Sequence, residues 1–330
     1  MTVQYGLCKC FFSKNFFIRK YEIHVTFLNK AQFLEDFSKI LKAKGCSDPE
    51  KLVPELEKEV ERRQHVHEER RRHQLYVAEE YSRFHPKIFT LQSSFLDPRF
   101  CEMVSHARKP DCTADDLKAY MKGLQMRMYS FPVFTPSFCQ MFVEELKHYE
   151  TSSIPKFQAA SMSKFAIDLG VLGFDQFLSD LRTAYLAPLV KVLYPDWGGD
   201  QLDTHKAFIA QYKEGRNLDT SYHFDNSEVT LNVSLNETFD DGDLYFGAMR
   251  GEESSFHTGY SHQLGRGILH RGQQMHGAFP IMEGERYNLI VWLRSSRIRN
   301  QLCPMCNEKP KIKAVENGFG DGFTLDDNTV

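Results

Sequence analysis

The chain has 330 residues, of which 42% are hydrophobic and 13% aromatic, so it has enough apolar surface to offset the entropy lost on ordering, and an intrinsically disordered protein is excluded. This length suits one large domain with an appendage, or two modest domains. The formal net charge of -3 excludes a global field that would attract nucleic acid or an anionic membrane, so partners must be inferred from individual sites.

The N-terminus and the cysteines bear on the cellular compartment. Residues 1–12 lack the basic and apolar segments of a signal peptide, and no stretch approaches about 18 apolar residues. Four of the eight cysteines are scattered, which does not suit a disulfide framework in a chain of this size. We therefore expect reduced thiols and a soluble cytoplasmic or nuclear protein, with no membrane association and no evident nucleic-acid partner.

Helical periodicity dominates the N-terminal part. Apolar residues on one face predict a short helix over 33–44, which Gly45 ends. Ser47 with Glu50 reads as a capping box that opens a longer helix, which we expect to run through Glu55 to about Ser82 and to bend or restart near Pro54.

The middle of that longer helix, 57–73, is almost wholly charged. A metal or nucleic-acid role for His65, His67 and the arginines of 70–72 is one interpretation. Glutamates interleave with these bases, however, and this pattern favours a solvated helix face.

A helical layer is predicted next. Thr113 opens a short helix over 113–123, and Thr135 caps another helix that begins directly after it. Apolar positions recur every three and four residues over 174–193, where Pro188 is expected to kink or end the helix.

The hydrophobic period changes to that of strands after about residue 205. Glycines and an Asp-Gly pair separate the apolar runs, and many short strands with such turn signals predict a sandwich or jelly roll. The predicted strands are 207–213, 220–225, 228–236, 243–247, 265–270, 275–279 and 285–294.

His223 and Asp225 lie in one of these strands, where a period of two places both side chains on the same face. His276 follows about fifty residues later and could supply a third ligand. Two histidines and one carboxylate leave three positions of an octahedral metal open, which favours non-haem iron(II). Arg286, ten residues past His276, has a planar guanidinium that can bind a carboxylate bidentately.

Several stretches resemble the catalytic domain of procollagen lysyl hydroxylases, which are iron(II) and 2-oxoglutarate-dependent oxygenases of the prolyl and lysyl hydroxylase type. They are FPVFTPSFCQMFVEELKHYE, HFDNSEVTLNVSLN, GDLYF and HGAFPIMEGERYNLIVWL, and the resemblance covers about half the chain. It implies that His223, Asp225 and His276 are catalytic iron ligands and that Arg286 binds the distal carboxylate of 2-oxoglutarate. It also places Tyr212 where it could reach this co-substrate, although a core aromatic residue is an equal interpretation.

The resemblance implies an α+β fold in which a double-stranded β-helix (jelly roll) with supporting helices follows a helical N-terminal region. We expect a mainly helical region over 1–125, an oxygenase domain over 126–300 with its barrel at about 205–295, and a tail over 301–330. The implied reaction hydroxylates a side chain of a protein or peptide substrate, releases succinate and CO2, and uses Fe(II) and L-ascorbate (vitamin C) as cofactors. The alternative is a catalytically slow or inactive iron and 2-oxoglutarate-binding module that acts as a sensor or adaptor.

Cys303 and Cys306 have the two-residue spacing of half a zinc site. Cys8 and Cys10 could complete a four-thiolate set if the two ends of the chain meet. Ordinary reduced cysteines are the other interpretation, and one such pair does not decide between the two.

Overall fold

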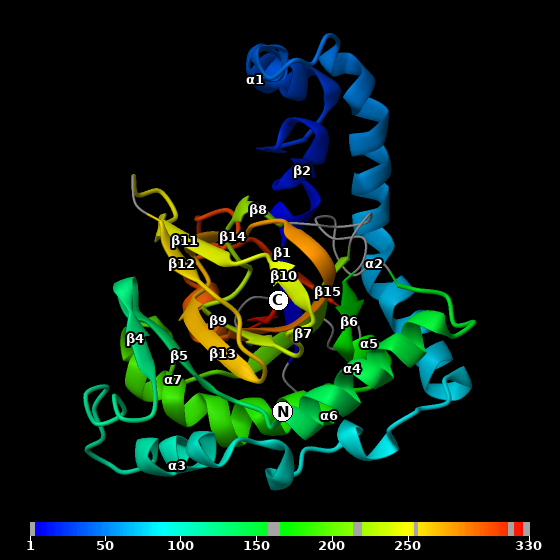
Figure 1. Cartoon of the computed structure of the whole chain (residues 1–330). Helices are drawn as coiled ribbons and strands as arrows, with labels where there is room; N and C mark the ends of the chain where they lie inside the picture. Colours follow the sequence, from blue (N-terminus) through cyan, green and yellow to red (C-terminus); the bar gives the residue numbers. More distant parts are fainter. Residues whose placement is uncertain (1–3, 158–165, 214–219, 254–256, 316–319, 326–330) are drawn as a thin grey trace.

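The computed structural model describes residues 4–157, 166–213, 220–253, 257–315 and 320–325 (Figure 1). Helices dominate up to Leu193 and antiparallel strands dominate from Thr204 to Arg294, so the fold is α+β, as predicted. No helix in these segments combines the length and the hydropathy of a membrane span. The α-helices are α1 (Lys30–Ala43), α2 (Val53–Glu80), α3 (Pro98–Ala107), α4 (Pro136–Thr151), α5 (Leu169–Leu172), α6 (Asp175–Asp180), α7 (Ala187–Leu193) and α8 (Ser296–Arg299).

Two antiparallel sheets form the centre of the molecule. The larger has the order β4 (Lys122–Leu124), β5 (Met128–Pro132), β13 (Arg266–Arg271), β9 (Val229–Ser234), β15 (Ile281–Arg294), β7 (Thr204–Lys213) and β6 (Ile167–Asp168), with β10 (Phe239–Asp241) beside β15. The smaller has the order β12 (Thr258–Tyr260), β11 (Leu244–Met249), β14 (Gln274–Ala278) and β8 (Thr220–His223). Every segment predicted as a strand between 207 and 294 overlaps one of these strands.

The larger sheet has one face in the core and one face toward a cavity. In β9, Leu231 is buried in the main hydrophobic core, whereas its neighbours Thr230 and Asn232 line the cavity. The same alternation in β15 sends Val291 to the core and Trp292 to the cavity. Helices α3, α4, α6 and α7 cover the core face and lie below the strands in Figure 1.

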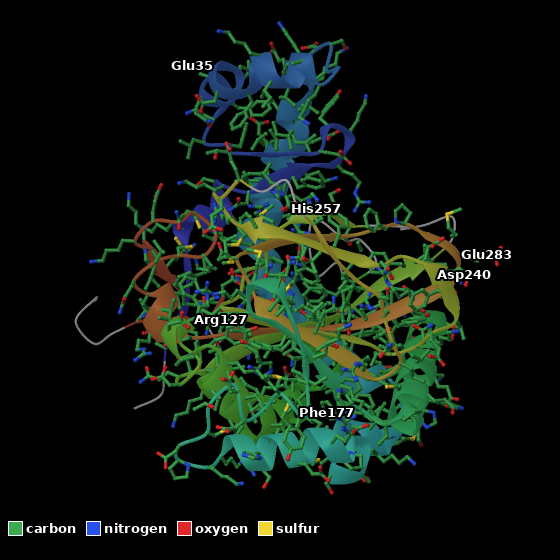
Figure 2. All side chains as sticks on the ribbon, turned by 60° about the vertical axis from the view of Figure 1, so that its left-hand side comes forward. Glu35, Arg127, Phe177, Asp240, His257 and Glu283 are labelled. Carbon is green, nitrogen blue, oxygen red and sulfur yellow. The ribbon has the colours of Figure 1, made fainter. Side chains whose placement is uncertain are left out.

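A second, smaller core lies at the far end of the molecule. Its buried residues come from the hairpin β2 (Phe16–Ile18) with β3 (Ile23–Val25), from α1 and from the start of α2. Figure 2 shows this arrangement, with Glu35 of α1 at one end of the molecule and Phe177 of α6 at the other. The main core instead joins Phe100 and Leu117 to the strands, so packing is continuous across the boundary predicted at residue 125.

The two ends of the chain share a sheet. Strand β1 (Tyr5–Cys8) pairs antiparallel with β16 (Ile312–Ala314) on one side and with β17 (Phe323–Thr324) on the other. Within the segment predicted as a tail, residues 312–314 and 323–324 therefore pack against the start of the described chain.

The charged middle of α2 is not simply a solvated face. Arg63 is 4% exposed, and its guanidinium donates hydrogen bonds to the carbonyls of Phe11, Lys14 and Asn15. Farther along, Arg70 donates to both carboxylate oxygens of the buried Asp168, at 2.9 and 3.0 Å. The prediction was wrong at these positions because a charge pattern along one helix does not reveal the carbonyls and carboxylates that fold against it.

Two predicted helix starts are shifted or absent. Asp48, not Ser47, caps the turn before α2, and its carboxylate accepts from the amide of Glu50 at 3.1 Å. Thr113 does bond to Asp116, but the residues that follow form turns rather than a helix. A local cap is therefore not sufficient to form a helix.

The predicted helix over 174–193 forms, with an irregular middle. A π-helical stretch, η7 (Leu181–Leu186), separates α6 from α7, and Pro188 lies in the first turn of α7. Because the three stretches are continuous, Pro188 lies inside the helix, where it cannot donate to the preceding turn, and the π-helical irregularity lies directly before it. The helix after Thr135 begins as predicted, since the Thr135 hydroxyl accepts from the amide of Phe138 at 3.4 Å.

A buried ion pair ties Glu228, directly before β9, to α8, and we expect it to matter for stability. Arg299 donates to both oxygens of Glu228 at 3.1 Å, and their side chains are 0% and 2% exposed. Glu228→Gln should lower the free energy of unfolding by about 3–5 kcal/mol in urea titrations, because it leaves a buried charge without its partner. Asp115→Asn, which breaks an exposed pair with Lys118, is the control and should leave the midpoint unchanged.

Candidate metal centre and its cavity

Strand pairing brings the two predicted histidine ligands together. β8 and β14 run antiparallel in the smaller sheet, with His223 directly opposite His276. Asp225 lies just past the end of β8, where its amide donates to the carbonyl of Gly272 at 2.8 Å. The strand was predicted to continue through Asp225, so the carboxylate arrives from a loop rather than by strand alternation.

The three side chains converge tightly. His223 Nε2 lies 3.6 Å from one oxygen of Asp225, and His276 Nε2 lies 3.7 Å from the other. One ligand atom from each residue lies within 4.8 Å of the others, and Asp225 and His276 are buried. Thr230 donates to Asp225 at 2.7 Å and so fixes the carboxylate.

Hydrogen bonds on the far side of each imidazole set its tautomer. Nδ1 of His223 lies 2.7 Å from the carbonyl of Ser221, and Nδ1 of His276 lies 2.9 Å from that of Gln274. A carbonyl only accepts, so Nδ1 carries the proton and Nε2 presents a lone pair toward Asp225. Burial lowers the pKa of His276 to about 3, which keeps it neutral at pH 7, as a metal ligand must be.

Arg286 is fully buried on β15, opposite Tyr212 of β7. Its guanidinium carbon lies 3.9 Å from the centre of the Tyr212 ring, and its Nη1 donates to the carbonyl of Gly242. Nε and Nη2 have no hydrogen-bond partner among the described residues, while the Tyr212 hydroxyl pairs with Thr220 at 2.5 Å. Burial lowers the pKa of Arg286, yet an arginine stays charged at pH 7.

Burying the N–H groups of Nε and Nη2 without acceptors costs free energy, and a carboxylate beside them would remove that cost. The donor set of Arg286 therefore fits a carboxylate ligand. Gly242 takes part in this geometry and was not predicted to do so. A Cβ on Gly242 would lie 2.6 Å from Arg286 Nη1, and the φ of Gly242 is +77°. The glycine of the Asp-Gly turn before β11 therefore also leaves room for the Arg286 guanidinium.

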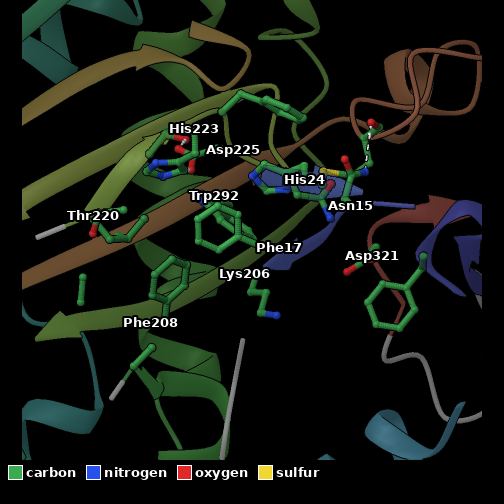
Figure 3. Close-up of a pocket in the computed structure, with 18 of the residues that line it drawn as sticks. Asn15, Phe17, His24, Lys206, Phe208, Thr220, His223, Asp225, Trp292 and Asp321 are labelled. Carbon is green, nitrogen blue, oxygen red and sulfur yellow. Dashed lines mark hydrogen bonds and ion pairs between the residues drawn. The ribbon is translucent and has the colours of Figure 1, made fainter. Parts of the chain in front are cut away.

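A cavity of about 400 Å³ opens over the three ligands (Figure 3). Its sheet wall includes Phe208, Asn232 and Trp292, and it reaches Tyr212 but not Arg286, which lies behind that ring. The facing wall was not predicted at all. It comes from the N-terminal segment, from α2 and from the C-terminal segment, and includes Asn15, Phe17, His24, His67, Met305 and Asp321.

Asn232 and Ser234 share one parity on β9, and Trp292 and Arg294 share one parity on β15, but only one residue of each pair lines the cavity. Asn232 and Trp292 line the cavity, whereas Ser234 donates to the carbonyl of Asn236, and Arg294 lies 3.6 Å from Asp321. Two other histidines near the site differ in burial, since His270 is 1% exposed and His257 is exposed.

Comparison with known proteins gives consistent matches. Residues 77–199 match a family model described as "OGFOD2-like domain". The chain is 41% identical over 326 residues to "2-oxoglutarate and iron-dependent oxygenase domain-containing protein 2" of Danio rerio, covering 97% of this chain and 94% of that protein. The Homo sapiens protein of the same name is 40% identical over 332 residues, with 97% and 94% covered.

Among solved structures, a Pseudomonas putida prolyl-4-hydroxylase is similar with a TM-score of 0.40 and 17% identity, over 58% of this chain and 98% of that one. The two vertebrate relatives match nearly the whole chain, including the N-terminal segment that walls the cavity as well as the sheets.

Proposed function

Because this chain belongs to the family of 2-oxoglutarate and iron-dependent oxygenase domain-containing protein 2, we propose that it is a working Fe(II)- and 2-oxoglutarate-dependent dioxygenase that hydroxylates a protein side chain. The observation that carries this proposal is the convergence of His223, Asp225 and His276 in a cavity, close to the buried Arg286. A scaffold that binds neither metal nor carboxylate would have no use for a converging ligand set close to a buried guanidinium whose Nε and Nη2 lack partners among the described residues.

Each residue has a distinct part in the proposal. His223, Asp225 and His276 hold the ferrous ion, while the carbonyls of Ser221 and Gln274 keep the imidazoles in the ligating tautomer. When bound, iron and 2-oxoglutarate together supply the oxidation of a C–H bond, with succinate and CO2 as co-products. L-ascorbate belongs to the proposal as the reductant that keeps the ion ferrous.

Arg286 holds the distal carboxylate of 2-oxoglutarate through its unpaired Nε and Nη2. Tyr212 separates the guanidinium from the cavity, so a small movement of its ring opens the path between metal and arginine. We also propose that the two sheets form the double-stranded β-helix of this reaction class, since the histidine ligands lie on the smaller sheet and Arg286 on the larger.

The cavity suits one side chain of a larger substrate. A volume of about 400 Å³ lies at the low end for ligand pockets. Aromatic rings of Phe17, Phe208 and Trp292 line it and would exclude water from a methylene group. The proposed substrate is therefore a protein or peptide residue with an aliphatic stem, as in lysine or proline.

The direct test is iron-dependent succinate release. Protein stripped of metal by a chelator should release no succinate from 2-oxoglutarate in air, and added Fe(II) should restore release that rises further with lysine- or proline-containing peptides. Anaerobic titration should show 2-oxoglutarate binding only with metal present. If the loaded protein binds 2-oxoglutarate but releases no succinate with any peptide pool or cell extract, the sensor or adaptor alternative replaces the enzyme.

A further inference from the structure

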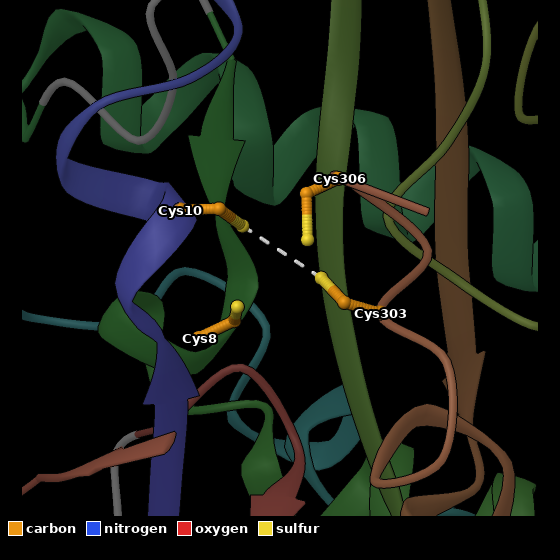
Figure 4. A group of neighbouring side chains, drawn as sticks. All are labelled: Cys8, Cys10, Cys303 and Cys306. Atoms are coloured by element: carbon orange, nitrogen blue, oxygen red, sulfur yellow. Dashed lines mark hydrogen bonds between the residues drawn. The ribbon is translucent and has the colours of Figure 1, made fainter. Parts of the chain in front are cut away.

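Four cysteines from opposite ends of the chain meet beside the cavity (Figure 4). Cys8 ends β1 and Cys10 follows it, while Cys303 and Cys306 lie in the loop after α8. Their Sγ atoms all lie within 4.8 Å of one another, with Cys10 and Cys303 at 3.7 Å, and the side chains point toward a common centre. We propose that this cluster binds one Zn²⁺ ion, separate from the iron centre.

The spacing fits a single tetrahedral ion. Zinc–sulfur bonds of roughly 2.3 Å place the sulfurs of a tetrahedral site about 3.8 Å apart. A disulfide needs about 2.05 Å, and all eight cysteines are free in this structure. Four thiolate ligands favour zinc, whereas two imidazoles and a carboxylate, as at the proposed iron centre, favour iron(II). The two sites would therefore select different metals.

The backbone holds both pairs in place. The amide of Cys303 donates to the carbonyl of Glu308, and the amide of Asn307 returns to the carbonyl of Cys303, both at 2.9 Å. This closes the loop that carries Cys303 and Cys306 into a tight turn. On the other side, the pairing of β1 with β16 fixes the position of Cys8.

The surroundings match the charge of such a site. Zinc with four thiolates has a net charge of −2, and binding would release the thiol protons to solvent. Cys8, Cys10 and Cys303 are at most 9% exposed, so a buried anion needs a cation nearby. Arg250 supplies one, because its Nη1 donates to the carbonyl of Pro304, inside the second cysteine pair, at 2.7 Å.

The position gives the ion a structural purpose. Cys8, Cys10 and Cys303 line the same cavity as His223, and Asn15 donates to the carbonyl of Met305 at 3.2 Å. Arg250 also stacks on Phe224, which lies between the iron ligands His223 and Asp225, at 4.0 Å. A four-thiolate site leaves no open position on the metal for catalysis, which makes the ion structural. It would link the N-terminal wall of the cavity, through Cys8 and Cys10, to the loop after α8.

The test is metal content, read independently of activity. Protein produced with zinc should contain one zinc ion per chain by mass spectrometry, and a mercurial reagent should release it only as four thiols react. Replacement by Co²⁺ should give the intense sulfur-to-metal absorption of a tetrahedral tetrathiolate site. Both measurements use the wild-type chain, so they do not depend on whether a cysteine variant folds.

Variants then separate the two metal sites. Cys303→Ser with Cys306→Ser should remove the zinc, whereas Cys101→Ser with Cys112→Ser, two partly exposed cysteines elsewhere, should retain it. His276→Ala should also retain zinc while losing iron, which keeps failure of the proposed function distinct from failure of this inference. Zinc-free wild-type protein whose four thiols react freely, or zinc that persists in the Cys303/Cys306 variant, would overturn the proposal.

Discussion

Replacing His276 with alanine is expected to weaken Fe(II) binding by more than about 100-fold and to abolish succinate release, because the loss of a ligand should exceed the 10- to 100-fold cost of losing a residue behind one. The imidazole is buried, and its Nε2 faces Asp225 at 3.7 Å. The measurement is anaerobic Fe(II) titration by calorimetry, with succinate assayed in parallel.

His257→Ala is the matched control. This histidine directly precedes β12, which belongs to the same sheet as β14, but it is exposed and lies outside the ligand cluster. It should bind iron as the wild type does. Far-ultraviolet circular dichroism of both variants should match the wild type. A folded His276→Ala protein with wild-type affinity for iron would contradict the assignment of the metal centre.

Arg286→Ala is expected to leave iron binding intact while weakening 2-oxoglutarate binding by a factor of roughly thirty or more. Truncating one partner of a buried charge pair costs about 2–5 kcal/mol, and each 1.36 kcal/mol is tenfold in affinity. The unpaired Nε and Nη2 are the groups that the variant removes. Titration of iron-loaded, anaerobic protein with 2-oxoglutarate measures the effect.

Two further variants sharpen this result. Arg286→Lys should recover part of the affinity, because it retains the charge but loses the fork that binds a carboxylate bidentately. Arg297→Ala, which breaks a half-exposed pair with Asp200, is the control and should bind 2-oxoglutarate normally. Unchanged affinity in Arg286→Ala would mean that the co-substrate carboxylate lies elsewhere.

The sequence predicted the strands that form one wall of the cavity, for a physical reason. In strands such as 228–236 and 285–294, successive side chains alternate between the two faces of the sheet. The residues that share a face with Asn232 or with Trp292 therefore follow from the sequence of each strand alone. His276 was predicted only as a possible third ligand, and its place directly opposite His223 depends on the pairing of β14 with β8.

The opposite wall of the cavity could not be predicted in this way. β1, β2 and β3 have three or four residues each, too few to show a period, and β1 depends on partners about 300 residues away. The same reason explains why Arg63 was expected in solvent, since the carbonyls that bind it belong to that segment. The short strands β10 and β12 were missed for lack of alternation.

The pairing of β1 with β16 and β17 also constrains how the molecule assembles. During synthesis β1 emerges about 300 residues before β16 and β17, and the backbone groups on both its edges stay without these partners until then. The larger sheet and its helices can fold while translation continues. The parts of the cavity wall that come from Met305 and Asp321 are therefore synthesised last, after the N-terminal segment and α2 that make up the rest of this wall.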